Sequence, residues 1–143
     1  DPYIEEMFGK SVLLMHGDLL CTADINYQSF RKTSRDKKWQ KEFLSKPLKE
    51  RQKIAKDLRD ISKKATNQKK AEIMDVTPSE VLNTMERTSV NLLIHGHTHR
   101  PDSQDIQINN QPAKRLVLGD WDQYGWYIWM DSDSCELNRF SIS

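Results

Sequence analysis

The four histidines of this chain occupy two short segments, and each segment contains a glycine. His16 begins a His-Gly-Asp sequence, and His95, His97 and His99 alternate with a glycine and a threonine. Neutral imidazole is the commonest nitrogen ligand of divalent transition metals, and a loop can aim neighbouring imidazoles separately. The Gly-His-Thr-His sequence therefore predicts that His97 and His99 bind a metal ion.

The other two histidines leave alternatives open. On its own, His16 fits a hydrogen-bonded structural residue somewhat better than a metal ligand. A third ligand only two residues from His97 would crowd the metal site, so we expect His95 to lie beside the ligands or against a substrate. Arg100 follows directly and fits a phosphate contact and a solvated loop equally well.

The elements that position these histidines are two short apolar runs, at 11–15 and 90–94, each of which predicts a buried strand. A buried strand fixes the start of the next loop, and glycine lets that loop approach a ligand closely. Further strands are expected at 104–108, 114–118, 125–130 and 135–142. Trp121, Trp126 and Trp129 are expected to pack in the core or on a sheet face.

A helical segment separates the two histidine strands. Glycine and proline are almost absent from 25–70, and apolar residues recur there at helical spacing, which predicts a hairpin of helices at 36–45 and 47–64. A later Thr-Pro-Ser-Glu sequence at 77–80 is a capping box that predicts another helix. The inner face of this later helix is expected to be Val81, Leu82 and Met85.

Charge divides the chain more sharply than its net value of +1 indicates. Residues 31–70 contain 16 cationic and five acidic side chains, so this segment carries +11 and the rest carries −10. An asymmetry of this kind indicates contact with a polyanion. Trp39, Phe43 and Leu44 add an apolar side, so we expect an anionic membrane surface as the partner, ahead of a solvated face, and no nucleic acid.

Composition excludes several classes of protein. No apolar run is long enough for a membrane span, and the first residues lack the basic and apolar regions of a secretory signal. Cys21 and Cys135 form no CxxC spacing, which favours a reducing cytosolic compartment. Because the sequence starts without methionine, we expect a fragment or a processed chain.

Several segments together resemble the UDP-2,3-diacylglucosamine diphosphatases of lipid A biosynthesis, in the calcineurin-like metallophosphoesterase superfamily. The similar segments are His16-Gly17-Asp18, Tyr27-Gln28-Ser29-Phe30-Arg31, Ala71 to Val76 and His95 to Pro101. The resemblance extends from residue 8 onward and includes the helical segment, which generic phosphoesterases lack. It implies an α+β fold, a four-layer α-β-β-α sandwich with a helical lid insertion at 24–70, and that 1–143 is the C-terminal part of one domain.

The resemblance also implies the reaction and its residues. The family hydrolyses the pyrophosphate of UDP-2,3-diacylglucosamine with two manganese ions, on the cytoplasmic face of the bacterial inner membrane. His16 and His97 would hold the second ion and His99 the first. Beside the resemblance, we expect His97 and His95 to be the catalytic residues, since His95 could protonate or hydrogen-bond the phosphate. The substrate contacts implied by position are Asp24, Tyr27, Arg59, Ser62, Thr66, Lys69 and His97. Thr66 departs from the family, which usually has asparagine there.

Other motifs of the family are missing from this sequence. It contains no Asp-x-His and no Gly-Asn pair, and Gly119-Asp120 follows a strand without being expected to supply a ligand. The bridging carboxylate of a two-metal site is therefore absent, and we expect the 143-residue chain alone to be inactive. Two alternatives stay open: a metal- or lipid-binding fragment without catalysis, and another metallophosphoesterase such as a phosphodiesterase or nuclease.

Overall fold

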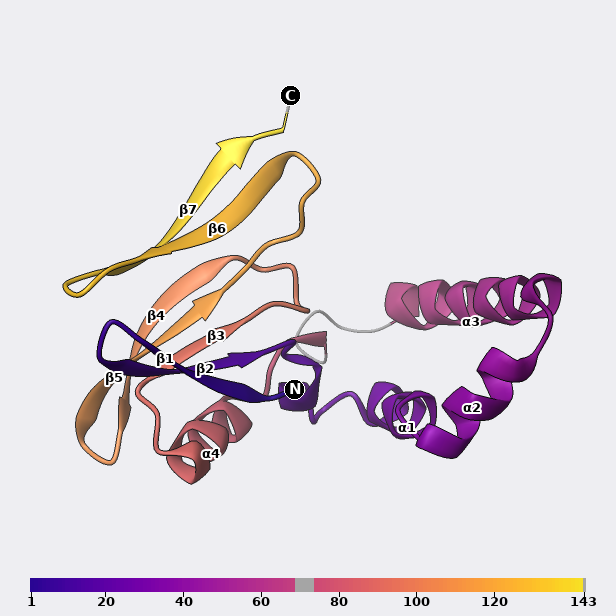
Figure 1. Cartoon of the computed structure of the whole chain (residues 1–143), viewed down its shortest axis with the longest axis horizontal. Helices are drawn as coiled ribbons and strands as arrows, with labels where there is room; N and C mark the ends of the chain where they lie inside the picture. Colours follow the sequence, from indigo (N-terminus) through magenta and orange to yellow (C-terminus); the bar gives the residue numbers. More distant parts are fainter. Residues whose placement is uncertain (69–73, 143) are drawn as a thin grey trace. The chain divides into compact units, whose positions relative to one another are not determined.

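The computed structural model describes residues 1–68 and 74–142, with side chains described for 1–65 and 74–142. The chain divides into two compact units (Figure 1). The first, which we call the sheet unit, comprises Asp1–Leu20 and Val76–Ser143. The second, the helical unit, comprises Cys21–Asp75, so its bounds enclose the predicted insertion at 24–70.

The sheet unit is built on five strands in the order β1-β2-β3-β5-β4. Their bounds are β1 Tyr3–Met7, β2 Lys10–Met15, β3 Leu92–His95, β4 Asp102–Ile108 and β5 Gln111–Val117. The three central strands β2, β3 and β5 are parallel, and β1 and β4 pair antiparallel at the two edges. Both histidine-bearing strands therefore lie side by side at the centre, with their carboxyl ends at the same edge of the sheet.

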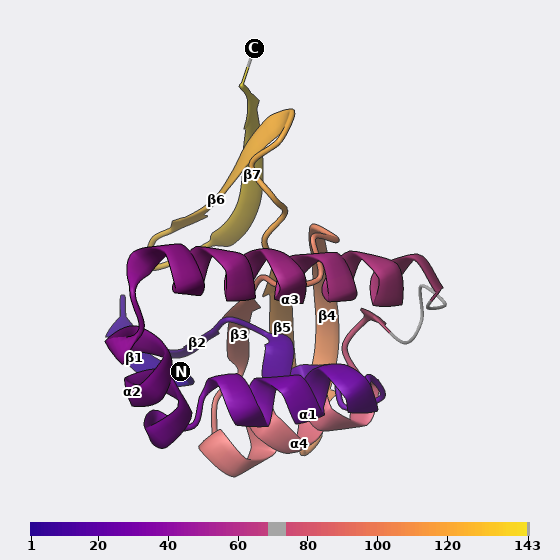
Figure 2. The same cartoon turned by 90° about the vertical axis from the view of Figure 1, so that its right-hand side faces the viewer.

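Apolar side chains cover both faces of this sheet. On one face Val12, Leu92 and Leu116 pack against Ile128 and Leu137 of a hairpin formed by β6 (Tyr124–Met130) and β7 (Cys135–Ser141). The helix α4 (Pro78–Thr88) lies on the other side of the sheet in both views (Figures 1 and 2). Central strands covered on two faces read as continuous apolar runs, which is why they were recognisable in the sequence.

The helical unit contains α1 (Ile25–Ser34), α2 (Lys37–Ser45) and α3 (Leu48–Gln68) (Figure 2). Aspartates begin the first two: Asp24 accepts a hydrogen bond from the Tyr27 amide at 3.0 Å, and Asp36 accepts one from the Trp39 amide at 2.8 Å. Such caps satisfy amides that have no partner within the helix. The predicted hairpin corresponds to α2 and α3, and α3 runs four residues further than expected, to Gln68.

Three expectations about the sheet unit are wrong. Leu82 is 37% exposed because it lies one residue past the buried Val81, about 100° around the helix. Trp129 is 61% exposed because Ile128 and Met130 take the inward side of β6, and Trp121 lies before the strand and is 65% exposed. The Thr77 side chain makes no capping hydrogen bond, although α4 does begin at Pro78.

The strand β1 was not predicted at all. Its sequence Tyr-Ile-Glu-Glu-Met has no continuous apolar run, and most of its residues are exposed. It is held by antiparallel pairing with β2 across a tight connection, in which Phe8 and Gly9 both have positive φ. The α+β class is confirmed by the sheet and the four helices.

Candidate functional site

The two histidine segments meet because β2 and β3 are neighbouring parallel strands. Met15 is paired with His95 in the register of the two strands, so the loops that follow begin at the same level. The Gly96 amide donates to the His16 carbonyl at 3.0 Å and joins the loops directly. The His16 and His97 rings lie edge to face, with centroids 4.8 Å apart. The structure therefore brings two imidazoles together from distant parts of the sequence.

Glycine at position 17 is required by this close approach. Gly17 has a φ of +107°, which side-chain-bearing residues rarely adopt. A Cβ there would also lie 2.7 Å from Nδ1 of His95 and 2.9 Å from the Gly96 carbonyl oxygen. Gly96 differs, because a Cβ at that position would meet nothing nearer than 3.8 Å. The first glycine is thus a packing requirement of the site.

His97 and His99 both have left-handed backbones, with φ of 71° and 54°. Non-glycine residues in this region store strain, and such positions cluster at functional sites because the surrounding structure must hold them. The intervening Thr98 amide donates to the Gly96 carbonyl at 2.9 Å and tightens the turn. This backbone turns His97 toward His16 and leaves the His99 side chain 64% exposed.

Two of the histidines have a carboxylate at Nδ1. Asp18 Oδ1 lies 3.2 Å from Nδ1 of His16, and Asp120 Oδ2 lies 3.4 Å from Nδ1 of His99. A carboxylate that holds the Nδ1 proton leaves Nε2 as the lone-pair nitrogen, which is the usual arrangement of metal-binding histidines. Sequence reasoning missed both carboxylates as partners, although Asp18 lies only two residues after His16.

His95 is the most buried of the four, with 1% of its surface exposed. Its Nε2 accepts a hydrogen bond from Nε of Arg115 at 2.9 Å, and its Nδ1 lies 2.9 Å from the Gly96 carbonyl oxygen. Arg115 comes from β5 and is itself buried. No sequence signal near His95 indicated this contact, because β5 reaches it only through pairing with β3.

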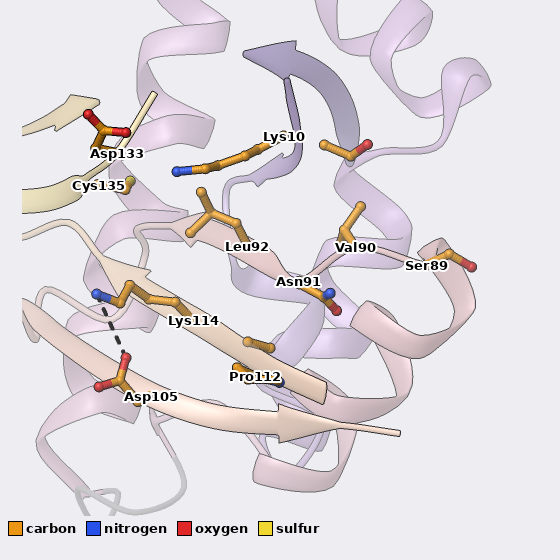
Figure 3. A pocket seen from close by; sticks show the side chains of 12 residues that line it. Lys10, Ser89, Val90, Asn91, Leu92, Asp105, Pro112, Lys114, Asp133 and Cys135 are labelled. Atoms are coloured by element: carbon orange, nitrogen blue, oxygen red, sulfur yellow. Dashed lines mark ion pairs between the residues drawn. The ribbon is translucent and has the colours of Figure 1, made fainter. Parts of the chain in front are cut away.

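A cavity of about 480 Å³ lies at the opposite, amino ends of the parallel strands (Figure 3). Lys10, Lys114, Leu92 and Cys135 are among its lining residues. Burial raises the pKa of the Cys135 thiol, while the two lysines oppose that shift. A thiol with a raised pKa is a poor nucleophile at neutral pH, so Cys135 is not suited to nucleophilic chemistry in this cavity.

Comparison with known proteins identifies the relatives of the chain. A protein of Marinobacter nauticus named UDP-2,3-diacylglucosamine hydrolase is 53% identical over 129 residues, which are 90% of this chain and 52% of that protein. Proteins of the same name from Ectopseudomonas mendocina and Pseudomonas entomophila are 44% and 46% identical across the whole chain, over 59% and 60% of their own lengths. The chain is therefore similar to proteins named UDP-2,3-diacylglucosamine hydrolase. No protein family profile matches it.

The resemblance inferred from the sequence is thereby confirmed, and the chain spans little more than half the length of these hydrolases. Among the residues that the structure describes, no three His, Cys, Asp or Glu side chains converge as a metal site would require. The described part supplies two adjacent imidazoles, a third on the same loop and two orienting carboxylates. This donor set fits part of a hydrolase metal site, and the predicted manganese ions stay a prediction.

Apart from His97, the substrate contacts expected for a hydrolase of this kind fall in the helical unit. Asp24 and Tyr27 meet at the start of α1, where the aspartate acts as the helix cap. Arg59 and Ser62 are exposed and lie one turn apart on α3, so they share a face. The Thr66 side chain and Lys69 lie outside the described residues.

Proposed function

We propose that this chain supplies part of an active site that hydrolyses the pyrophosphate of UDP-2,3-diacylglucosamine, giving UMP and 2,3-diacylglucosamine 1-phosphate in lipid A biosynthesis. The observation that carries the proposal is the pairing of His16 with His97 at the ends of adjacent parallel strands, in a homologue of proteins named for that substrate. The hairpin over one face of the sheet and α4 on the other are consistent with part of a four-layer α-β-β-α sandwich.

We expect His16 and His97 to hold one of two manganese ions and His99 to hold the other. When bound, such ions lower the pKa of a bound water and offset negative charge on phosphoryl oxygens. Asp18 and Asp120 orient His16 and His99 from their Nδ1 sides. The sequence contains no Asp-x-His motif, so residues beyond this chain would have to complete the ligand set.

The helical unit is proposed to contact the lipid substrate and an anionic membrane surface. Most of its cationic side chains are exposed, and so are apolar residues such as Ile25, Leu44 and Ile61. On α2 the Trp39 and Phe43 rings stack, with centroids 5.2 Å apart, and both side chains are partly exposed. In the part of the chain that the structure describes, no helix is long and apolar enough to cross a bilayer. The mode we propose is binding from the cytoplasmic side, at the inner-membrane surface, through these exposed cations and apolar residues.

Turnover of UDP-2,3-diacylglucosamine with Mn²⁺ tests the reaction. We expect activity from a protein of the relatives' full length and little or none from the 143-residue chain. His97→Ala and His99→Ala should each lower activity of the longer protein by orders of magnitude and reduce its manganese content. Lys10→Ala, at the amino end of β2, is the control and should retain activity. Full activity and metal content in His99→Ala would contradict the proposed site.

Vesicle co-sedimentation tests the surface contact. Reversing Lys37, Lys38 and Lys41 to Glu should weaken binding to anionic vesicles, because each cation near lipid headgroups contributes about 1 kcal/mol. The remaining binding should depend less on salt, since screening acts on the charge contribution alone. Lys10→Glu in the sheet unit should bind like the parent. Unchanged binding by the triple variant would exclude the surface role, and stronger binding to duplex DNA than to vesicles would favour a nuclease.

A further inference from the structure

Arg115 links three strands through its guanidinium group. Its Nε donates to Nε2 of His95 on β3 at 2.9 Å, and its Nη1 donates to Oε1 of Gln104 on β4 at 2.7 Å. Gln104 and Arg115 are directly paired across β4 and β5, so the strand register itself sets this contact. Arg115 and His95 are 7% and 1% exposed. A charged group this buried is costly unless its hydrogen bonds are satisfied, which makes the arrangement specific.

The directions of these bonds fix the state of the imidazole. A guanidinium nitrogen can only donate, so Nε2 of His95 must be the acceptor. A carbonyl oxygen can only accept, so Nδ1 must carry the proton toward Gly96. The ring is therefore neutral and protonated at Nδ1, whereas histidine free in water favours the Nε2–H form. Arg115 selects the less common tautomer.

The His95 ring in turn contacts both loops of the candidate site. A Cβ added at Gly17 would lie only 2.7 Å from its Nδ1, so the ring packs directly against that loop. The same nitrogen is hydrogen-bonded to the Gly96 carbonyl oxygen of the other loop. The Gly96 amide holds the His16 carbonyl. A rotated ring, or one without the proton on Nδ1, would lose the bond to Gly96, so the spacing of His16 and His97 depends on the ring.

We infer that Arg115 is a positioning residue that acts through His95, fixing its tautomer and thereby the two loops that carry His16 and His97. Because Nε2 of His95 is occupied by Arg115, His95 serves as the support of the site and does not donate a proton to phosphate. The role in catalysis rests on the proposed function, but the geometry is testable in this chain without turnover.

Nitrogen NMR of the His95 ring and hydrogen exchange of the Gly96 amide provide the test. In the parent chain we expect a protonated Nδ1 and an unprotonated Nε2. Arg115→Met keeps the apolar stem and removes the donors, so the Nε2–H tautomer should appear and Gly96 should exchange about tenfold faster. Lys114→Met is the matched control. Lys114 is the neighbour of Arg115 on β5, and its side chain pairs with Asp105 at 3.7 Å and not with His95, so the variant should change neither signal.

Unchanged His95 nitrogens and Gly96 exchange in a folded Arg115→Met chain would overturn the inference. If that variant fails to fold, His95→Gln and His95→Leu decide the matter, because a glutamine oxygen can accept from Arg115 and leucine cannot. We expect the glutamine variant to protect Gly96 within about twofold of the parent and the leucine variant to lose protection. Equal loss of Gly96 protection in both variants would refute the proposed role of the Arg115–His95 hydrogen bond. Inactivity of the longer protein would instead count against the proposed reaction alone.

Discussion

Leu13, Leu93 and Leu116 in the sheet unit are fully buried, whereas Ile25 and Leu44 in the helical unit are 72% and 62% exposed. The sheet unit buries a set of large apolar residues between its layers, although it also exposes others such as Trp129, whereas no described side chain of α1, α2 or α3 is buried. A buried core holds side chains to within small distances, which a metal site needs. Exposed apolar residues beside cations are suited to an external surface, so the two units are built for different tasks.

The largest effect separating the units should come from deleting core volume. Leu13→Ala should destabilise the sheet unit by about 3 kcal/mol, because lost burial and a residual cavity both contribute. Urea unfolding followed by the amide signals of β2 and β3 measures the change. Leu44→Ala removes the same atoms from an exposed position and should change stability by less than about 0.5 kcal/mol. Equal effects at the two positions would remove the distinction between the units.

A smaller effect is expected from the glycine between the histidine loops. Gly17→Ala combines a strained φ with a collision against His95, and should cost about 2 kcal/mol. The control is Gly96→Ala, where a Cβ has room, and it should cost clearly less. Both are measured by urea unfolding. A Gly17→Ala chain as stable as Gly96→Ala would mean that the loops do not approach as described.

Stability in the helical unit should depend on local hydrogen bonds. Asp36→Ala removes the cap that accepts from the Trp39 amide, and should destabilise α2 by about 1 kcal/mol without affecting the sheet. Faster exchange of the Trp39 amide and lower helical circular dichroism would show it. Asp57→Ala, an exposed aspartate inside α3, should raise helicity instead, because alanine is the better helix former there.

The smallest effect is expected on how the stability of the protein depends on pH in acid. Hydrogen bonds from the backbone amides of Ser134 and Asp133 lower the pKa of Asp131 in the turn between β6 and β7. A lowered folded pKa adds stability above the usual aspartate value of 3.8, and that stability disappears as pH falls through the lower folded value. Asp131→Asn should therefore flatten the acid side of the stability curve slightly. An identical pH dependence in parent and variant would show that the turn contributes nothing.

The sequence was informative where the signal was local. The apolar runs before His16 and His95 predicted β2 and β3, two of the three central strands. The spacing of apolar residues predicted α2 and α3, and the capping box at 77–80 predicted α4. Pairing of β2 with β3 is not local, so the approach of His16 to His97 rested on resemblance alone. The same limit hid the contact of Arg115 with His95, since three strands must assemble before those side chains meet.

The tryptophans show a second limit. Alternation along β6 indicates that two faces exist, but it does not say which face another layer covers. Ile128 and Met130 face the sheet, and the larger Trp129 faces away from it. The prediction from strand positions put all three tryptophans in the core or on a sheet face, whereas the register of the hairpin leaves Trp129 on the exposed side.

Leu13 of β2 pairs with Leu93 of β3, and the whole helical unit is inserted in the sequence between these two strands. The entropy of closing a loop grows only with the logarithm of its length, so doubling the connection costs about 0.6 kcal/mol. The folding rate is more sensitive to the length of this connection, because β2 and β3 are distant in the sequence and must meet before they can pair. The helices α1 to α3 instead form from contacts between near neighbours. Evolution can therefore lengthen, shorten or reshape the connection with little loss of equilibrium stability, leaving the histidine strands unchanged while the helical surface diverges.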